Sequence, residues 1–389
     1  MVATPMNFIP ATEATEAAPK PHVHIPALDA VRGLAIILVT IYRFAGANVD
    51  TSQPGMALFK LFKPLDIGVD LFFVLSGFLI TGILVDSKSK PHYFSHFFAR
   101  RSLRIFPLYF GVLIGVFLLL PLFSSLTTEL FPNAQAKQGW LWLYGANILI
   151  GLTSDWMVLD RFGHFWSLAV EEHFYLVWPF VIYALSRKAA MRACAILSVA
   201  SMLARGYYTY KYGEAANVGA ETFTWLRLDC LALGGWGALA ARGPQGLTGM
   251  HAKAWVMGAI GLGTILLMVA VGRTSILNMS MIVYALFFMS FILVMAQPEP
   301  IIGLKWLGNN RVLHFFGKYS YGMYVFQNLL IPIVAPIISA AIFAEKFGSL
   351  AAGQLAYLVV MFGLTTLTAL ASWHLYEKHF LKLKKYVGG

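Results

Sequence analysis

The chain has 389 residues, of which 58% are hydrophobic and only 12% charged, whereas soluble domains carry about 25% charged residues. That leaves too little polar surface to cover a water-soluble globule, so the composition predicts an integral membrane protein. The formal net charge of +11 would suggest nucleic acid for a soluble protein, but basic loops of a membrane protein account for it. We therefore expect no nucleic-acid partner.

The first element is a polar segment rich in Pro and Ala, residues 1–26. It lacks the basic-then-apolar order of a signal peptide, so we predict a disordered cytoplasmic tail. The chain holds two cysteines, Cys194 and Cys230, both in apolar runs. Neither has the spacing of a disulfide or a metal ligand, and we predict no metal site and no permanently bound cofactor.

Apolar runs long enough to cross a bilayer follow along the rest of the chain. A transmembrane helix needs about 20 apolar residues. This window predicts an all-α protein with one transmembrane domain over 27–380, followed by a basic cytoplasmic tail over 381–389. The apolar stretch 139–152 is shorter and predicts a re-entrant or surface helix. The ten predicted spans are 28–46, 66–86, 105–123, 166–186, 190–209, 223–241, 254–271, 277–297, 318–343 and 350–375.

The charges between the predicted spans indicate the orientation. Lys and Arg near span ends stay on the cytoplasmic side. With the amino terminus inside, each inner connection is basic, whereas the outer connections mix both signs. The pattern favours ten spans with both termini in the cytoplasm. The inner connections and the tail hold Lys88, Lys90, Arg100, Arg101, Arg104, Arg187, Lys188, Arg192, Arg242, Lys253, Lys305, Arg311, Lys318, Lys378, Lys382, Lys384 and Lys385.

Several ionisable residues fall inside the predicted spans, where each needs a partner or a wet cavity. Arg32 and Arg43 lie eleven residues apart on the first span, which is about 16 Å and three turns, so they share one face. Others lie near outer span ends, and we expect opposite charges to converge there on one polar cavity. The alternative is a buried ion network without chemistry. The predicted cluster is Arg43, Asp70, Glu171, Arg227 and Asp229.

These residues sit in seven strings that occur in a characteristic order. The strings are LDAVRGLAIILVTIYRF (28–44), GVDLFFVLSGFLIT (68–81), FFARRSLRIFPLYF (97–110), HFWSLAVEEHFYLVWP (164–179), RLDCLALGGWGA (227–238), KYSYGMYVFQ (318–327) and LYEKHFLKLKK (375–385). In order and spacing the chain resembles the acyltransferase-3 family, which includes bacterial O-antigen and peptidoglycan O-acetyltransferases.

The resemblance implies a ten-helix membrane core in the cytoplasmic (inner) membrane that transfers an acyl group, commonly acetyl. It implies cytoplasmic acyl-CoA as donor and a hydroxyl of an envelope or exported glycan as acceptor, besides contact with membrane lipid. The resemblance also implies that the protein is an enzyme, an O-acyltransferase. The alternative is a catalytically impaired relative that acts as a binding, regulatory or acyl-conducting membrane protein. An unrelated transporter would not explain the ordered strings.

Two positions depart from the family pattern. The first span of the family carries an Arg, ten residues and then the favoured catalytic His; Arg32 matches the Arg, but Arg43 stands at the His position. A guanidinium stays protonated and has no acceptor, so Arg43 can bind an oxyanion or a phosphate but cannot act as general base. Gln327 likewise stands where members often have His, and an amide does not titrate.

The resemblance assigns roles to the remaining motif residues. Glu171 takes the family's carboxylate position and is our first candidate for the base, with His173, and His164 nearby, as further candidates. Arg101 and Arg104 suit the phosphates of coenzyme A, or merely anchor the helix to the membrane surface. We predict catalytic roles for Glu171, Arg43, Arg32, His173 and Asp70; donor binding by Arg101, Arg104 and Arg32; and substrate binding by Asp229, Arg227, Gln327, Tyr321 and Trp166.

Overall fold

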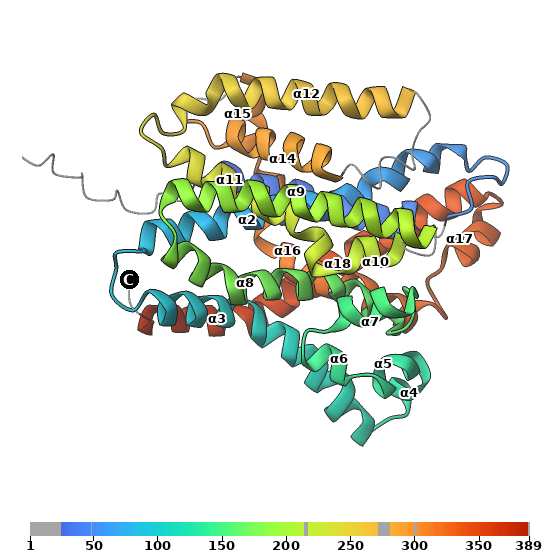
Figure 1. Ribbon diagram of the computed structural model, residues 1–389. Helices are drawn as coiled ribbons and strands as arrows, with labels where there is room; N and C mark the ends of the chain where they lie inside the picture. Colours follow the sequence, from blue (N-terminus) through green and yellow to red (C-terminus); the bar gives the residue numbers. More distant parts are fainter. Residues whose placement is uncertain (1–24, 48, 214–216, 271–280, 299–301, 388–389) are drawn as a thin grey trace, which may run out of the picture.

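The computed structural model describes residues 25–47, 49–213, 217–270, 281–298 and 302–387. Over these ranges the chain forms helices and loops and no β-strand. The predicted tail 1–26 lies outside them except for its last two residues. Figure 1 shows the long helices running along one common direction.

The helices have the following bounds. They are α1 Pro26–Ile41, α2 Gly68–Ser87, α3 Tyr93–Ile114, α4 Leu126–Leu130, α5 Pro132–Ala136, α6 Gly139–Trp142, α7 Ala146–Thr153, α8 Trp166–Ala184, α9 Arg187–Tyr212, α10 Asn217–Thr222, α11 Thr224–Ala241, α12 His251–Ala270, α14 Met281–Met295, α15 Ile302–Gly308, α16 Arg311–Val334, α17 Ala340–Phe347, α18 Leu350–Ser372 and α19 Lys378–Lys382. A π-helical turn, Tyr42–Gly46, extends α1, and 3₁₀ helices at Ala57–Ile67 and Asp160–Phe165 precede α2 and α8.

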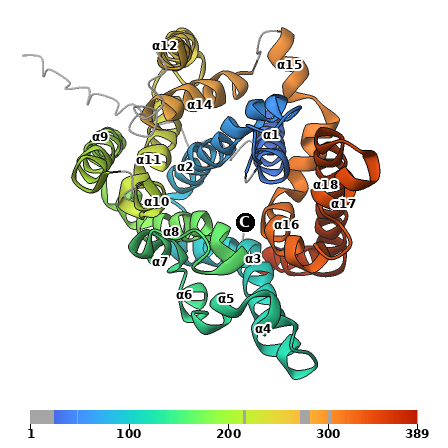
Figure 2. The ribbon, with the colours of Figure 1, turned by 90° about the vertical axis from the view of Figure 1, so that its right-hand side faces the viewer.

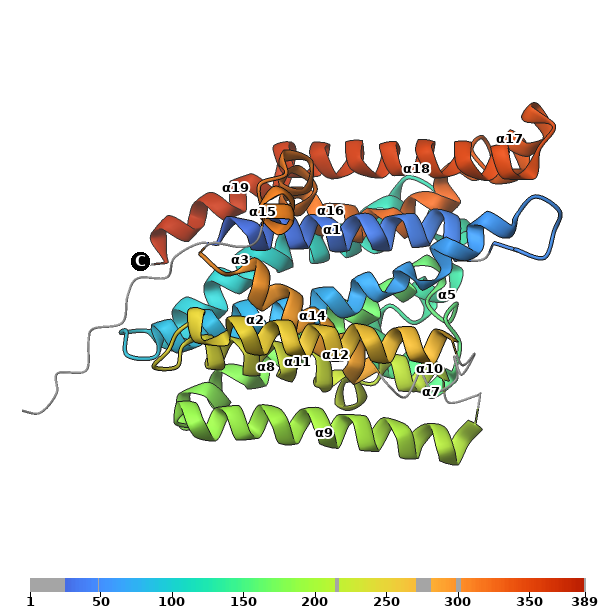
Figure 3. The same ribbon diagram turned by 90° about the horizontal axis from the view of Figure 1, so that it is seen from above.

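Two ends of the molecule can be named from these helices. We call the basic end the one where α1 and α3 begin, α2, α8 and α11 end, and the carboxyl terminus lies (Figure 1). The opposite end carries the short helices α4–α7, α10 and α17. Viewed along the helices, α1, α2, α11, α8, α3 and α16 surround the centre, with α9 and α12 outside them (Figure 2). Figure 3 shows α17 and α18 on one flank and α9 on the other.

Each of the ten predicted spans overlaps a helix, although some bounds were wrong and the helix of the eighth span, α14, has only 15 described residues. The third helix begins at Tyr93 rather than near 105, because its first turns carry arginines that face inward and lower the local hydropathy. The ninth helix ends at Val334 rather than at 343. Pro336 lacks the N–H that would continue it. The end of the seventh and the start of the eighth predicted span lie outside the described residues.

Five helical segments among the described residues are long and apolar enough to cross a membrane by length and composition: Ala57–Ser87, Tyr93–Leu122, Arg187–Tyr212, Thr248–Leu267 and Leu350–Tyr386. That the chain crosses the membrane ten times stays a prediction, as does the cytoplasmic position of both ends. The stretch 139–152 forms two short helices, α6 and α7, rather than one, and its re-entrant or surface position stays a prediction.

Glycines bring two pairs of central helices into close contact. A Cβ on Gly77 would stand 2.0 Å from the Leu231 carbonyl oxygen, and one on Gly234 would stand 2.0 Å from the Val74 carbonyl oxygen. Only glycine therefore permits the present approach of α2 to α11. Gly33 and Gly317 make the same reciprocal contact between α1 and α16. Small residues commonly allow such backbone contact between membrane helices.

We predict that Gly234→Ala lowers stability by about 1–3 kcal/mol, because the new methyl group forces α11 away from α2. Gly263→Ala on α12 is the matched control, since its Cβ would meet nothing within 4 Å. The measurement is the melting temperature of each detergent-solubilised variant. Equal melting temperatures for the two variants would contradict the close contact.

Candidate active site

A cavity of about 900 Å³ lies between the central helices and extends from the basic end toward the middle of the bundle. Ionisable residues line the part near the basic end: Asp29, Arg32, Asp86, Arg101, Arg104, Arg242 and Lys305. Polar residues line the part farther from that end: Ser76, Ser167, Glu171, Glu172, Tyr321 and Tyr324. Apolar side chains of α2 form much of the wall between them. A charged mouth thus leads to a polar interior past an apolar surface.

Glu171 is held inside the cavity by groups from three helices. The Arg101 Nη2 atom lies 3.9 Å from the Glu171 carboxylate. The Arg101 guanidinium carbon stands 3.8 Å from the centre of the Tyr175 ring, a cation–π contact. The Tyr175 hydroxyl shares a hydrogen bond with Ser76, and both lie within interaction range of the carboxylate. These contacts fix one carboxylate, partly exposed, where a ligand can reach it.

The cations of the cavity differ in their partners. Arg32 pairs with Asp29 at 2.6 Å, and Arg242 forms two 2.6 Å hydrogen bonds to the Asp86 carboxylate. Arg104 forms no ion pair with the described residues and lies within electrostatic range of Arg32 and Arg101. Like charges repel one another more strongly in a low dielectric. The surplus positive charge around Arg104 favours an anionic ligand.

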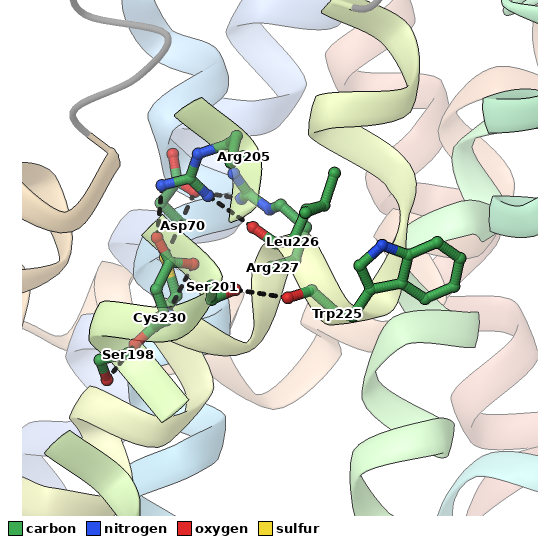
Figure 4. Close-up of polar contacts among 9 residues, drawn as sticks. Asp70, Ser198, Ser201, Arg205, Trp225, Leu226, Arg227 and Cys230 are labelled. Carbon is green, nitrogen blue, oxygen red and sulfur yellow. Dashed lines mark hydrogen bonds and ion pairs between the residues drawn. The ribbon is translucent and has the colours of Figure 1, made fainter. Parts of the chain in front are cut away.

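A buried ion network lies nearer the opposite end, between α2, α9 and α11 (Figure 4). Arg205, which is 0% exposed, bonds to Asp229 and to the Leu226 carbonyl oxygen, both at 2.6 Å. Arg227 pairs with Asp70. Its guanidinium carbon lies 5.2 Å from the Phe73 ring centre and 5.9 Å from that of Trp166.

This network corrects the expected single polar cavity. Asp70, Arg227 and Asp229 do not belong to the described lining of the cavity. Glu171 faces Arg101 rather than the residues of the network, because α8 turns this carboxylate toward α3. The expected residues thus divide between a cavity and a paired network. Sequence reasoning missed Arg205, although an arginine inside the fifth predicted span was a visible signal.

The two histidines proposed as alternative bases lie outside the described cavity lining. His173 Nδ1 bonds to the Thr224 hydroxyl at 2.7 Å. The ring nitrogens of His164 contact the carbonyl oxygens of Arg161 at 2.9 Å and Val325 at 3.1 Å. Their positions favour structural hydrogen bonding and leave Glu171 as the better placed candidate base.

Of the remaining predicted site residues, some line the cavity and others do not. Tyr321 lines it and donates its hydroxyl hydrogen to the Ile105 carbonyl oxygen at 2.9 Å. Gln327 is 0% exposed; its Oε1 accepts from Thr40 at 3.5 Å, while its Nε2 has no partner among the described residues. Arg43 also stays outside the described lining, and its guanidinium lies over the Tyr42 ring.

Comparison with known proteins shows the family to which the chain belongs. The profile described as "Acyltransferase domain" matches residues 25–376, nearly the whole chain. The chain therefore belongs to the acyltransferase-3 family, and with its apolar helices it is a multi-pass membrane protein. No solved structure matches it at a significant level.

Two relatives are named O-acetyltransferases. The peptidoglycan O-acetyltransferase OatA of Listeria monocytogenes is 31% identical over 164 residues, which are 40% of this chain and 24% of that protein. The O-acetyltransferase OatA of Staphylococcus aureus is 28% identical over 222 residues, 54% of this chain and 34% of that protein. The matched region thus spans about a third or less of these relatives.

We predict that Arg205→Met destabilises the protein by about 3–5 kcal/mol, because it leaves the Asp229 carboxylate buried without its cation. Adding Asp229→Asn should restore part of the loss, since an amide carries no charge. Arg192→Met, an exposed position on the same helix, is the control. The measurement is the melting temperature of each of the three variants in detergent. If Arg205→Met and Arg192→Met have the same melting temperature, the ion pair contributes nothing to stability.

Proposed function

We propose that this protein is an O-acyltransferase of the cytoplasmic membrane that moves an acyl group, first of all acetyl, from acyl-CoA to a hydroxyl of a cell-envelope glycan. Membership of the acyltransferase-3 family and the names of its relatives support acyl transfer to such a glycan. The observation that carries the proposal is a carboxylate, Glu171, inside a cavity in whose mouth cations outnumber carboxylates.

The donor side of the proposal rests on the charge and size of the cavity. Its volume of about 900 Å³ lies at the upper end of the ~300–1,000 Å³ common for small-molecule sites. Arg104, which has no carboxylate partner among the described residues, lies within electrostatic range of Arg32 and Arg101. Guanidinium groups bind phosphates through paired N–H donors. The phosphates of acyl-CoA would lie at the basic end, and the apolar wall would guide the thioester inward.

The reaction needs a base and a group that stabilises the developing oxyanion. Glu171 would accept the proton of the acceptor hydroxyl as that oxygen attacks the thioester carbonyl. The new C–O bond forms as the C–S bond breaks, and the thiolate of coenzyme A takes up the proton. Arg101, 3.9 Å from Glu171, stands where it can stabilise the oxyanion.

One observation favours a second candidate, a relative without activity. Arg43 and Gln327 replace the expected imidazoles, and both His164 and His173 lie outside the described lining of the cavity. If Glu171 cannot act as base, the cavity would bind a ligand or conduct it without transfer. An activity measurement with two variants separates the candidates.

We expect Glu171→Gln to reduce acyl transfer at least about 100-fold, the usual contribution of a general base. Membranes containing the protein receive labelled acetyl-CoA, and labelled glycan is counted. Glu345→Gln, an exposed carboxylate at the opposite end, should retain activity. A silent native protein that becomes active on Arg43→His would contradict the proposal and support an impaired relative.

We expect Arg104→Ala to raise the KM for acetyl-CoA roughly 10- to 100-fold, since it removes charge-assisted hydrogen bonds to phosphate. The kcat should change much less, because the proposal assigns Arg104 to the phosphates rather than to the reacting carbonyl. Lys382→Ala removes an exposed cation at the same end and serves as control. Equal changes in KM for both variants would indicate general surface attraction rather than a phosphate site.

A further inference from the structure

Two arginines at the opposite end lack the partners that other arginines have. Arg43 comes from the π-helical turn Tyr42–Gly46 and Arg161 from the 3₁₀ helix Asp160–Phe165. They lie within electrostatic range of each other. Neither guanidinium forms an ion pair or a hydrogen bond with the residues that the structure describes, and the Arg43 Nε atom is buried without a partner. Two like charges thus lie within electrostatic range of each other, and each residue is partly buried.

Five arginines elsewhere in the described chain have carboxylate partners. Arg32, Arg101, Arg205, Arg227 and Arg242 each pair with a carboxylate. Asp66 lies within electrostatic range of Arg43 but forms no ion pair with it among the described residues. A cation at membrane depth is costly without a counter-charge. A bound anion would supply that charge.

Neighbouring groups add a further hydrogen-bond donor. Thr40 lies three residues before Arg43, and its hydroxyl contacts the Gln327 side chain at 3.5 Å. The Nε2 atom of Gln327 is buried and without a partner in the described chain. A buried donor left unpaired costs free energy. The two positions at which the sequence departs from the family pattern thus both carry a buried unpartnered N–H group.

Tyr324 connects this region to the cavity. It lies within electrostatic range of both Arg43 and Glu171. Its hydroxyl donates to the His164 carbonyl oxygen at 3.0 Å and contacts the Ser167 hydroxyl at 2.5 Å. Tyr324 and Ser167 both line the cavity. The arginine pair therefore lies on the far side of Tyr324 from the proposed donor site.

We propose that Arg43 and Arg161 form an anion site, which holds the acidic group of a negatively charged glycan acceptor. The acid is a sugar carboxylate or a sugar phosphate, since guanidinium groups bind both. With the acid held there, a hydroxyl of the same glycan extends past Tyr324 toward Glu171. The binding site stands on its own observations; its role in acceptor binding rests on the proposed acyltransferase function.

Binding by the purified, detergent-solubilised protein tests the site without any acyl donor. The probes are glucuronate, glucose 6-phosphate and neutral glucose. Calorimetry measures the affinity of the protein for each of them. At least one of the two anions should bind about 10-fold more tightly than glucose, as expected for a charge-assisted contact. The better of the two anions identifies the acid as carboxylate or phosphate.

Variants show whether the binding depends on the two arginines. Arg161→Ala and Arg43→Gln should each weaken the preferred anion about 10-fold, and Arg43→Lys provides a milder change if Arg43→Gln does not fold. Lys60→Ala removes an exposed cation near the same end and should have no effect. Absence of a preference for anions, or equal weakening by Lys60→Ala, would overturn the site. If the protein binds the anion but transfers no acyl group, only the proposed activity is overturned.

Discussion

A charged side chain within an apolar helix needs a counter-charge, and this constraint organises the contact between α2 and α11. Arg227 pairs with Asp70 near one end of the two helices, and Arg242 binds Asp86 near the other. Between these pairs, Gly77 and Gly234 bring the backbones into contact. Arg205 on α9 then pairs with Asp229 on α11. Paired charges and close backbone contact thus hold three helices together, and two of them, α2 and α11, contribute to the cavity lining.

Some of the charged side chains in the cavity lack a full counter-charge. Arg101 is shared between Glu171 and the Tyr175 ring, while Arg104 has no carboxylate partner in the described chain. On the far side of Tyr324, Arg43 and Arg161 lack one too. Paired charges therefore accompany helix packing, whereas unpaired charges mark the positions where we propose that substrates bind. Two such positions, separated by Tyr324, suit a reaction between a donor from the basic end and an acceptor from the opposite end.

The sequence predicted the helices well because a bilayer requires about 20 apolar residues per crossing, and such runs are easily seen. It could not predict the rotation of each helix about its axis. Glu171 therefore appeared to belong with Asp70 and Arg227, although α8 turns it toward Arg101. The role of Arg205 depends on α9 lying against α11, which no local pattern reveals. The position of Arg104 in the cavity agrees with the sequence motif, whereas its ligand stays a prediction.

The most direct test of the account is the accessibility of the cavity wall at Leu79, which lines it from α2. Cys194 and Cys230 are both 0% exposed, so Leu79→Cys would provide the reactive thiol. A membrane-impermeant maleimide should label this cysteine from the cytoplasmic face, and acetyl-CoA should protect it unless Arg104→Ala is also present. Labelling from the outer face alone, or labelling that acetyl-CoA does not slow, would contradict a donor cavity that opens to the cytoplasm.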